Sequence, residues 1–122
     1  MVGRSRAVLS IVLVLVALLL LATLASAATF RVRARFTEDG YRWRPKTLLV
    51  PTGSRVVWKM VDGRHNVTSI GSNWSKSSDD ISAGGTTSFT YNSGGTYRYR
   101  CTLHSGLSAG TCTGMCGKIV VG

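Results

Sequence analysis

The sequence predicts an all-β protein, an antiparallel Greek-key β-sandwich of about seven to eight strands, over residues 28–122. Two observations predict this fold. Apolar and polar residues alternate strictly in 30–36, and 55–60 alternates again, with Val56, Trp58 and Met60 on one face and Arg55, Val57 and Lys59 on the other, as in strands with one buried face. Turn signals such as Asp39-Gly40 and Asp62-Gly63 separate short apolar runs, and no stretch of 28–122 has a helical period.

The individual strands follow from these local patterns. In 30–36 the apolar residues share one face and three arginines share the other, so the arginine face is expected to be solvated. In 97–101 two tyrosines and Cys101 share the face expected in the core. Residues 71–85 are rich in serine and glycine and are expected to be irregular. The strands expected from the pattern include 30–36, 47–50, 55–60, 86–91, 97–101 and 118–121.

Residues 1–27 are expected to be a targeting segment and not part of the sandwich. Arg4 and Arg6 precede an apolar stretch, 7–24, and a small-residue site at 25–27 follows it. This order is typical of a secretory signal peptide. The alternative is an uncleaved N-terminal membrane anchor, because a stretch of this length can just span a bilayer. Either reading predicts that the domain 28–122 is exported to the periplasm, the extracellular space or the outer face of the cytoplasmic membrane.

The chain is strongly basic. Its formal net charge is +10, and without Arg4 and Arg6 the remaining 13 basic and 5 acidic residues give +8. Such a balance often indicates nucleic-acid binding. Export argues against nucleic acid as a partner, and the arginines of 30–36 alternate with apolar residues as on the solvated face of a strand. We therefore expect an acidic protein partner or association with an anionic membrane surface.

Residues with metal-binding chemistry gather in 101–117. This stretch holds all three cysteines, His104 and Met115, and His65 follows an earlier strand. Two imidazoles, one thiolate and one thioether form the donor set that holds copper for electron transfer, with the methionine as a weak axial ligand. A rigid sandwich would keep the reorganisation of such a site small.

Three motifs resemble those of the blue (type 1) copper proteins, the cupredoxin family, nearest to its plastocyanin and amicyanin type. "GSRVVWKMVDGRHNV" at 53–67 is similar to the family's glycine, apolar strand and His-Asn. "GTYRYRCTLH" at 95–104 is similar to its Gly-x-Tyr-x-Tyr-x-Cys-x-x-His. "GMCGKIVV" at 114–121 is similar to its Gly-Met-x-Gly-x-Ile-x-Val. The resemblance covers nearly all of 28–122.

The resemblance implies one copper ion per chain, Cu(I) or Cu(II), held by four residues. These are His65, Cys101 and His104 as the strong ligands and Met115 as the axial ligand. It also implies that Asn66 hydrogen-bonds toward Thr102 and so ties two ligand segments together. In the family the methionine follows the histidine after a few residues, whereas here 105–114 intervene. A longer loop can still return to the metal, because each doubling of loop length costs only about 0.6 kcal/mol.

The odd number of cysteines leaves at least one thiol without an intramolecular partner. If Cys101 is the ligand, Cys112 and Cys116 remain as a disulfide pair. A turn containing Gly114 can bring their Cα atoms within the roughly 4.4–6.8 Å that a disulfide needs. That bridge would fix where Met115 returns to the copper. The alternative is that Cys101 pairs with one of the other two, which would abolish the metal site.

These expectations favour an exported, monomeric electron carrier, not an enzyme, that exchanges electrons with an acidic redox protein and is soluble or tethered. The alternatives are a copper-handling protein that buffers or delivers the metal without redox traffic, and a metal-free sandwich that acts as a binding module. A dinuclear copper centre does not fit, because Cys112 follows His104 and the order is wrong. The identity of the redox partners and the reduction potential do not follow from the sequence.

Overall fold

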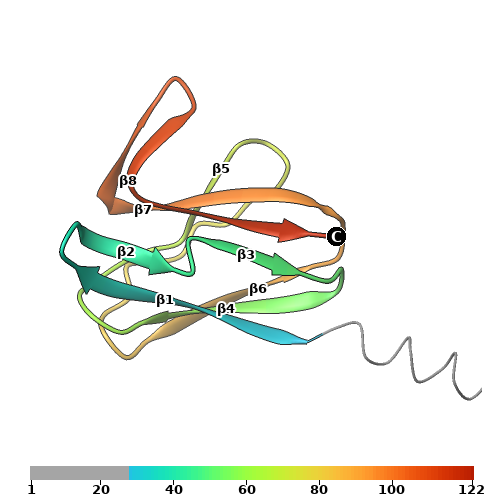
Figure 1. The fold of residues 1–122 in the computed structure, drawn as a ribbon, viewed down its shortest axis with the longest axis horizontal. Helices are drawn as coiled ribbons and strands as arrows, with labels where there is room; N and C mark the ends of the chain where they lie inside the picture. Colours follow the sequence, from blue (N-terminus) through green and yellow to red (C-terminus); the bar gives the residue numbers. More distant parts are fainter. Residues whose placement is uncertain (1–27) are drawn as a thin grey trace, which may run out of the picture.

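A computed structural model describes residues 28–122, so the signal or anchor expected at 1–27 lies outside the described residues. The described part consists of eight strands and their connections (Figure 1). The strands are β1 (Thr29–Thr37), β2 (Gly40–Arg44), β3 (Thr47–Val50), β4 (Ser54–Met60), β5 (Thr68–Ile70), β6 (Thr86–Tyr91), β7 (Gly95–Ser108) and β8 (Thr111–Val121). No helix that could cross a membrane occurs within 28–122.

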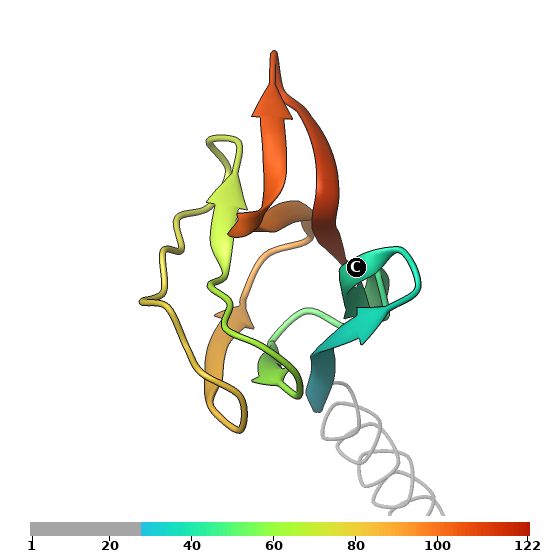
Figure 2. The same ribbon diagram turned by 90° about the vertical axis from the view of Figure 1, so that its left-hand side faces the viewer.

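The strands form two four-stranded sheets, in the orders β2-β1-β4-β6 and β3-β8-β7-β5. Seen along the long axis of the molecule, the sheets enclose a common interior (Figure 2). The predicted β-sandwich is confirmed, and its sheets are mixed, because β1 pairs with β4, and β3 with β8, in parallel. These parallel pairs arise because β3 crosses to the second sheet, so that β4 returns beside β1 in the same direction.

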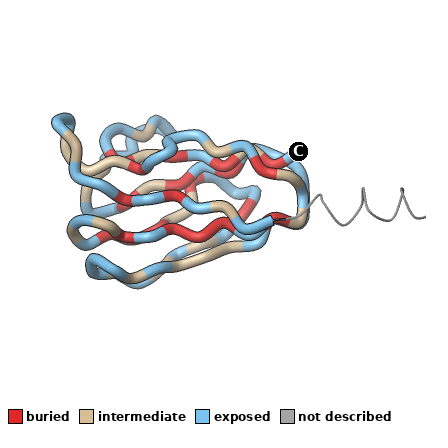
Figure 3. Tube along the Cα trace, turned by 60° about the horizontal axis from the view of Figure 1, so that its bottom comes forward, coloured by how far each residue is buried: buried red, intermediate tan, exposed pale blue. Residues whose placement is uncertain are grey.

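The core lies between the sheets and is made of their inward-facing residues. In the middle of β1 and in β4 the inward side chains are buried, as the alternation predicts: Val32, Ala34 and Trp58 are fully buried. Val57, expected on the outward face of β4, is buried as well. Buried positions run along the middle of the strands, and exposed positions dominate the connections at the ends (Figure 3). Phe36 lies on the same face of β1 as Val32 and Ala34, yet it is 65% exposed. It lies near the end of the strand and packs edge-on against Tyr41 instead.

Residues 105–114, expected to be a loop, form a β-hairpin extension of β7 and β8 that projects from the sandwich (Figure 1). Residues 105–108 pair with 111–114, which leaves a two-residue turn at Ala109-Gly110. Both turn residues have positive φ, 48° and 80°, as the tight turns of two-residue hairpins require. Pairing between β7 and β8 is interrupted between Arg100 and Ser105, just where the metal-ligand candidates lie.

The two ends of the sandwich differ in what they carry. The start of β1 and the C-terminus lie at one end, whereas the β1–β2 turn and the base of the β7–β8 extension lie at the other (Figure 1). Because β4 runs parallel to β1, the connection after β4, which contains His65, also lies at this second end. We call it the ligand end.

Candidate metal centre

Three donor atoms converge at the ligand end. His65 Nδ1 lies 3.2 Å from His104 Nδ1, and Cys101 Sγ lies 3.8 Å from the first nitrogen and 3.5 Å from the second. His65 and Cys101 are fully buried, and His104 is half-buried. These three residues are the group of histidine and cysteine side chains in the described part that could hold a metal ion.

The triangle has the size that a metal ion needs. The point in its plane that is equidistant from the three donor atoms lies about 2.0 Å from each. Metal–imidazole bonds are about 2.0–2.1 Å long and metal–thiolate bonds about 2.3 Å, the zinc values serving as a guide. A trigonal set of two imidazoles and one thiolate is the arrangement that suits copper. The residues therefore fit a single copper ion.

The protonation of His65 is fixed by its other ring nitrogen. Nε2 contacts the backbone carbonyl of Asp62, and because a carbonyl can only accept, Nε2 carries the proton. Nδ1 is then unprotonated and turns its lone pair toward Cys101 and His104. Burial lowers the pKa of His65, while the bond to Asp62 acts in the opposite direction. Burial is the larger effect and keeps the ring neutral, and the bond to Asp62 fixes its orientation, which gives an imidazole of the kind that binds metals.

Each donor comes from a segment with a local reason for its position. His65 sits in an isolated bridge with Ile81, where its N–H and C=O both bond to that residue. Cys101 continues the inward alternation of β7. His104 lies in the interrupted stretch between Arg100 and Ser105, where the irregular pairing lets its ring turn back toward Cys101.

Met115 lies on β8 beside this set. It is fully buried in the core cluster that also contains Cys101, and its carbonyl accepts a hydrogen bond from Trp43 Nε1 at 3.2 Å. The preceding residue, Gly114, has a φ of 88°, and a Cβ there would come within 2.6 Å of the His104 carbonyl oxygen. Only glycine allows β8 to pass this close to the His104 segment.

Asn66 and Thr102, expected to bond, are joined directly. Asn66 Nδ2 donates to Thr102 Oγ1 at 2.7 Å, and Asn66 Oδ1 accepts from the Thr102 backbone N–H at 3.0 Å. The amide also donates to Asp80 Oδ1 and accepts from the hydroxyl of Thr68. Asn66 therefore ties the segment after His65 to the segment after Cys101.

The disulfide predicted between Cys112 and Cys116 is present, with a Cα–Cα distance of 6.1 Å, and Cys101 is a free, buried thiol. The alternative in which Cys101 forms a bridge is therefore wrong. Both cysteines lie on β8, Cys112 in the hairpin extension and Cys116 directly after Met115, so the bridge spans the point where the chain returns to the ligand end.

Two aromatic residues of β2 pack on the histidines, and the sequence analysis missed them. The ring of Tyr41 lies 4.5 Å from that of His104 and 4.8 Å from that of His65, and the ring of Trp43 lies 6.1 Å from His65. The alternation of "GYRWR" at 40–44 places both rings on one face. The sequence of 40–44 does not indicate that this face contacts the histidines, because that contact depends on the position of β2 in the sheet.

Comparison with protein families gives one match. The model of the copper-binding proteins of the plastocyanin/azurin family matches residues 30–122, which is nearly the whole described part. No curated protein matches the chain.

Solved structures with similar folds include three copper proteins. A pseudoazurin from Sinorhizobium is 24% identical, with a TM-score of 0.61, over 78% of this chain and 74% of that one. An amicyanin variant is 23% identical, with a TM-score of 0.61, over 77% of this chain and 82% of that one. A purple cupredoxin from Nitrosopumilus maritimus is 21% identical, with a TM-score of 0.58, over 75% of this chain and 98% of that one. At these identities the structures support the fold.

Proposed function

The chain belongs to the plastocyanin/azurin family of copper-binding proteins, and on this basis we propose that it is an exported one-electron carrier with a single type 1 copper ion. The observation that supports this function most directly is the donor triangle of His65, Cys101 and His104, whose size suits one copper ion. Bound copper supplies the one-electron exchange between Cu(I) and Cu(II). The protein supplies the frame, the burial and the path for the electron.

We assign the ligands as His65 Nδ1, His104 Nδ1 and Cys101 Sγ, with Met115 as the axial ligand. Met115 is fully buried in the same cluster as Cys101, which is the environment an axial thioether needs. The Asn66–Thr102 bonds, the Asp62 carbonyl on His65 and the rings of β2 resist movement of the donors. A frame that does not relax keeps the reorganisation energy small when the charge changes.

His104 is the point where an electron would enter and leave. His104 is half-buried, whereas His65 and Cys101 are fully buried. It is therefore the residue of the three through which the metal site reaches the protein surface. The neighbouring Leu103 is 49% exposed and gives a partner an apolar contact beside the ring. We propose that the partner is a redox protein, acidic as the net charge of +8 favours, and that the carrier is a monomer.

Two alternatives are less well supported. A copper-delivery protein would present exposed methionines, but Met60 and Met115 are both fully buried. A metal-free binding module would need Cys101 in a disulfide, but that thiol is free. A role for Cys101 as a catalytic nucleophile is not expected, because Nε2 of His65 is bound to a backbone carbonyl and not to a carboxylate.

An optical spectrum of the copper-loaded, oxidised protein tests the proposal. We expect an intense visible band from charge transfer between the Cys101 thiolate and Cu(II), at one copper per chain. Cys101→Ser should abolish the band, whereas the double variant Cys112→Ser and Cys116→Ser should keep it. A Cys101→Ser protein that stays coloured would show that the ligand assignment is wrong, and copper that binds but cannot be cycled between its two states would favour metal handling.

A further inference from the structure

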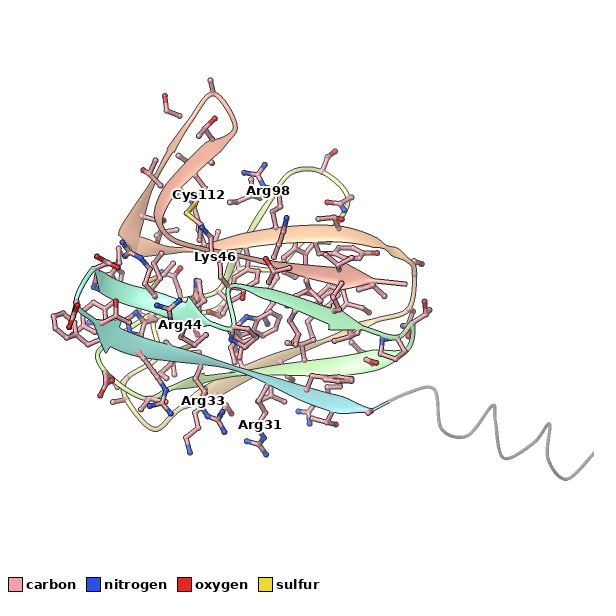
Figure 4. The ribbon with its side chains drawn as sticks, viewed as in Figure 1. Arg31, Arg33, Arg44, Lys46, Arg98 and Cys112 are labelled. Atoms are coloured by element: carbon pink, nitrogen blue, oxygen red, sulfur yellow. A yellow bond between two sulfur atoms is a disulfide. The ribbon has the colours of Figure 1, made fainter. Side chains whose placement is uncertain are left out.

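The outer face of the first sheet carries basic side chains on three of its four strands. Its positively charged side chains come from β1, β2 and β4. Side chains alternate between the two faces of a strand, and Val32 and Trp58 point inward, so all of these charged side chains point outward. We call this surface the basic face; it consists of Arg31, Arg33, Arg35, Arg42, Arg44, Arg55 and Lys59. Figure 4 shows Arg31 and Arg33 on one side of β1, pointing away from the interior of the sandwich.

The strand register places like charges directly opposite each other on this face. Arg33 has Arg44 as its cross-strand partner on one side and Lys59 on the other, and Arg35 faces Arg42. Like charges in directly opposite positions destabilise a sheet. The face thus carries an electrostatic cost, and no ion pair within residues 28–122 offsets it.

The carboxylates that could neutralise these charges lie elsewhere. All five acidic residues of the chain lie in connections between strands: Glu38, Asp39, Asp62, Asp79 and Asp80. The ion pair found among residues 28–122, Arg64–Asp80, joins two of these connections and does not include the basic face. Asp62 Oδ2 accepts from the Phe36 N–H at the end of β1, but no ion pair within 28–122 joins a carboxylate to the basic face. The face therefore carries a clear excess of positive charge and is complementary to an array of anions.

We propose that the basic face docks on an anionic lipid bilayer. A four-stranded sheet face is about 15–20 Å wide, and Arg31 and Arg35 lie about 13 Å apart along β1. A surface of this size can bring several cations within one Debye length, about 8–10 Å, of a layer of lipid phosphates at the same time. Arginine suits this contact, because its guanidinium binds phosphate oxygens in pairs.

The position of the basic face favours a membrane over a redox protein as the occupant. An electron-transfer partner must approach His104 at the ligand end, whereas the basic face extends along the strands to Arg31 and Arg55 near the opposite end. The apolar stretch 7–24 also precedes β1 closely in the sequence. If that stretch remains in the membrane, it brings the start of β1 to the bilayer surface. Docking through the basic face would leave the ligand end free to meet a partner.

The test is vesicle binding by residues 28–122, which contain all eight strands and the whole described core. The copper-loaded protein is sedimented with vesicles of phosphatidylcholine mixed with phosphatidylglycerol, and with phosphatidylcholine alone. We expect binding to the anionic vesicles only, and its loss at high salt. The triple variant Arg31→Gln, Arg33→Gln and Arg35→Gln should bind on the order of a hundredfold more weakly, since each cation near an anionic surface strengthens binding several-fold.

A control variant with the same change in net charge, placed on the other sheet, distinguishes an effect of the basic face from an effect of net charge. Lys46, Arg98 and Lys118 lie on the outer side of the other sheet, where Arg98 and Lys118 are cross-strand partners. Replacing these three by glutamine should weaken vesicle binding by only a few-fold. Equal losses in both variants would overturn the proposal, as would the absence of binding to anionic vesicles. A basic-face variant that binds vesicles normally but transfers electrons more slowly to an acidic protein would identify the face as a protein-docking site instead.

Discussion

Asn66 and Thr102 are joined by two hydrogen bonds, one to the hydroxyl and one to the backbone N–H, at 2.7 and 3.0 Å. Asn66 follows His65 and Thr102 follows Cys101, so this pair connects two ligand segments that lie 36 residues apart. The connection does not involve the metal, and it therefore holds the donors in place in both oxidation states.

Removing this connection should lower stability by a graded amount. Asn66→Ala removes the partly buried bond to the Thr102 N–H together with the bonds to Thr102 Oγ1, Asp80 and Thr68, and should cost about 2–3 kcal/mol of unfolding free energy. Thr102→Val removes only the hydroxyl bond and should cost about 1 kcal/mol. Denaturant unfolding of the copper-free proteins measures both changes. Equal effects of the two variants would show that the backbone bond contributes nothing.

The disulfide should position Met115 more than it stabilises the fold. The loop it closes is small, so by chain entropy it contributes only about 2 kcal/mol. Replacing Cys112 and Cys116 by serine should leave copper bound but shift the visible spectrum or the reduction potential, because the return of β8 to the ligand end loosens. An unchanged spectrum and potential would mean that the bridge does not position Met115. Mass spectrometry of the unreduced, alkylated protein should find the free thiol at Cys101.

Gly114 and Gly110 provide a matched pair, because both have positive φ and only one is crowded. At Gly114 an added Cβ meets the His104 carbonyl at 2.6 Å, whereas at Gly110 nothing lies within 4 Å. Gly110→Ala should cost about 1 kcal/mol, from backbone strain alone. Gly114→Ala should cost about 3 kcal/mol or more and also change the visible spectrum, because His104 must move. Equal costs in thermal unfolding would contradict the close approach.

Tyr99 and Tyr97 should respond oppositely to loss of their hydroxyls. Among residues 28–122 the buried Tyr99 hydroxyl has no hydrogen-bond partner, whereas that of Tyr97 donates to the Ser93 carbonyl at 2.8 Å. Tyr99→Phe should therefore leave stability at pH 7 unchanged or raise it by about 1 kcal/mol, and Tyr97→Phe should lower it by about 1 kcal/mol. Denaturant unfolding decides the sign, and a clear loss in Tyr99→Phe would show that the hydroxyl has a partner.

Alkaline pH gives a second test of Tyr99. Burial raises its pKa above that of an unfolded tyrosine, which is about 10. A raised pKa means that the unfolded chain releases its proton first, so the stabilisation is complete below pH 10 and is lost as the pH rises above it. The free energy of unfolding should therefore fall more gently above pH 10 in Tyr99→Phe than in the parent. Parallel curves would contradict the shift.

Electron transfer to an acidic protein should depend on salt. With a formal charge of +8 on residues 28–122, attraction should accelerate the encounter at low ionic strength, and screening should slow it as salt is added. Transfer to a basic acceptor should show the opposite trend or a slower rate throughout. Stopped-flow measurements over a range of ionic strength provide the comparison. Rates that do not depend on salt for either acceptor would exclude an acidic partner selected by charge.

The sequence by itself determined the elements that depend on local pattern. Alternation predicted most of the buried side chains of β1, β4 and β7, because the two-residue period of a strand sorts neighbours onto opposite faces; Val57, which is buried, and Phe36, which is exposed, are the exceptions. The residue types at 65, 101, 104 and 115 predicted a copper donor set, because few combinations of soft and borderline ligands have another use. The cysteine count, with Cys101 taken as a ligand, predicted the bridge between Cys112 and Cys116.

The tertiary structure alone decided what depends on residues distant in the chain. Two strand pairs are parallel because of how the chain crosses between the sheets. Tyr41 and Trp43 meet the histidines because β2 lies beside β1 at the ligand end. Residues 105–114 are a hairpin and not a loose loop because their two halves find each other in register. The alternating arginines of β1 become an array only when β2 and β4 bring Arg44 and Lys59 to either side of Arg33, a register that arises from long-range pairing.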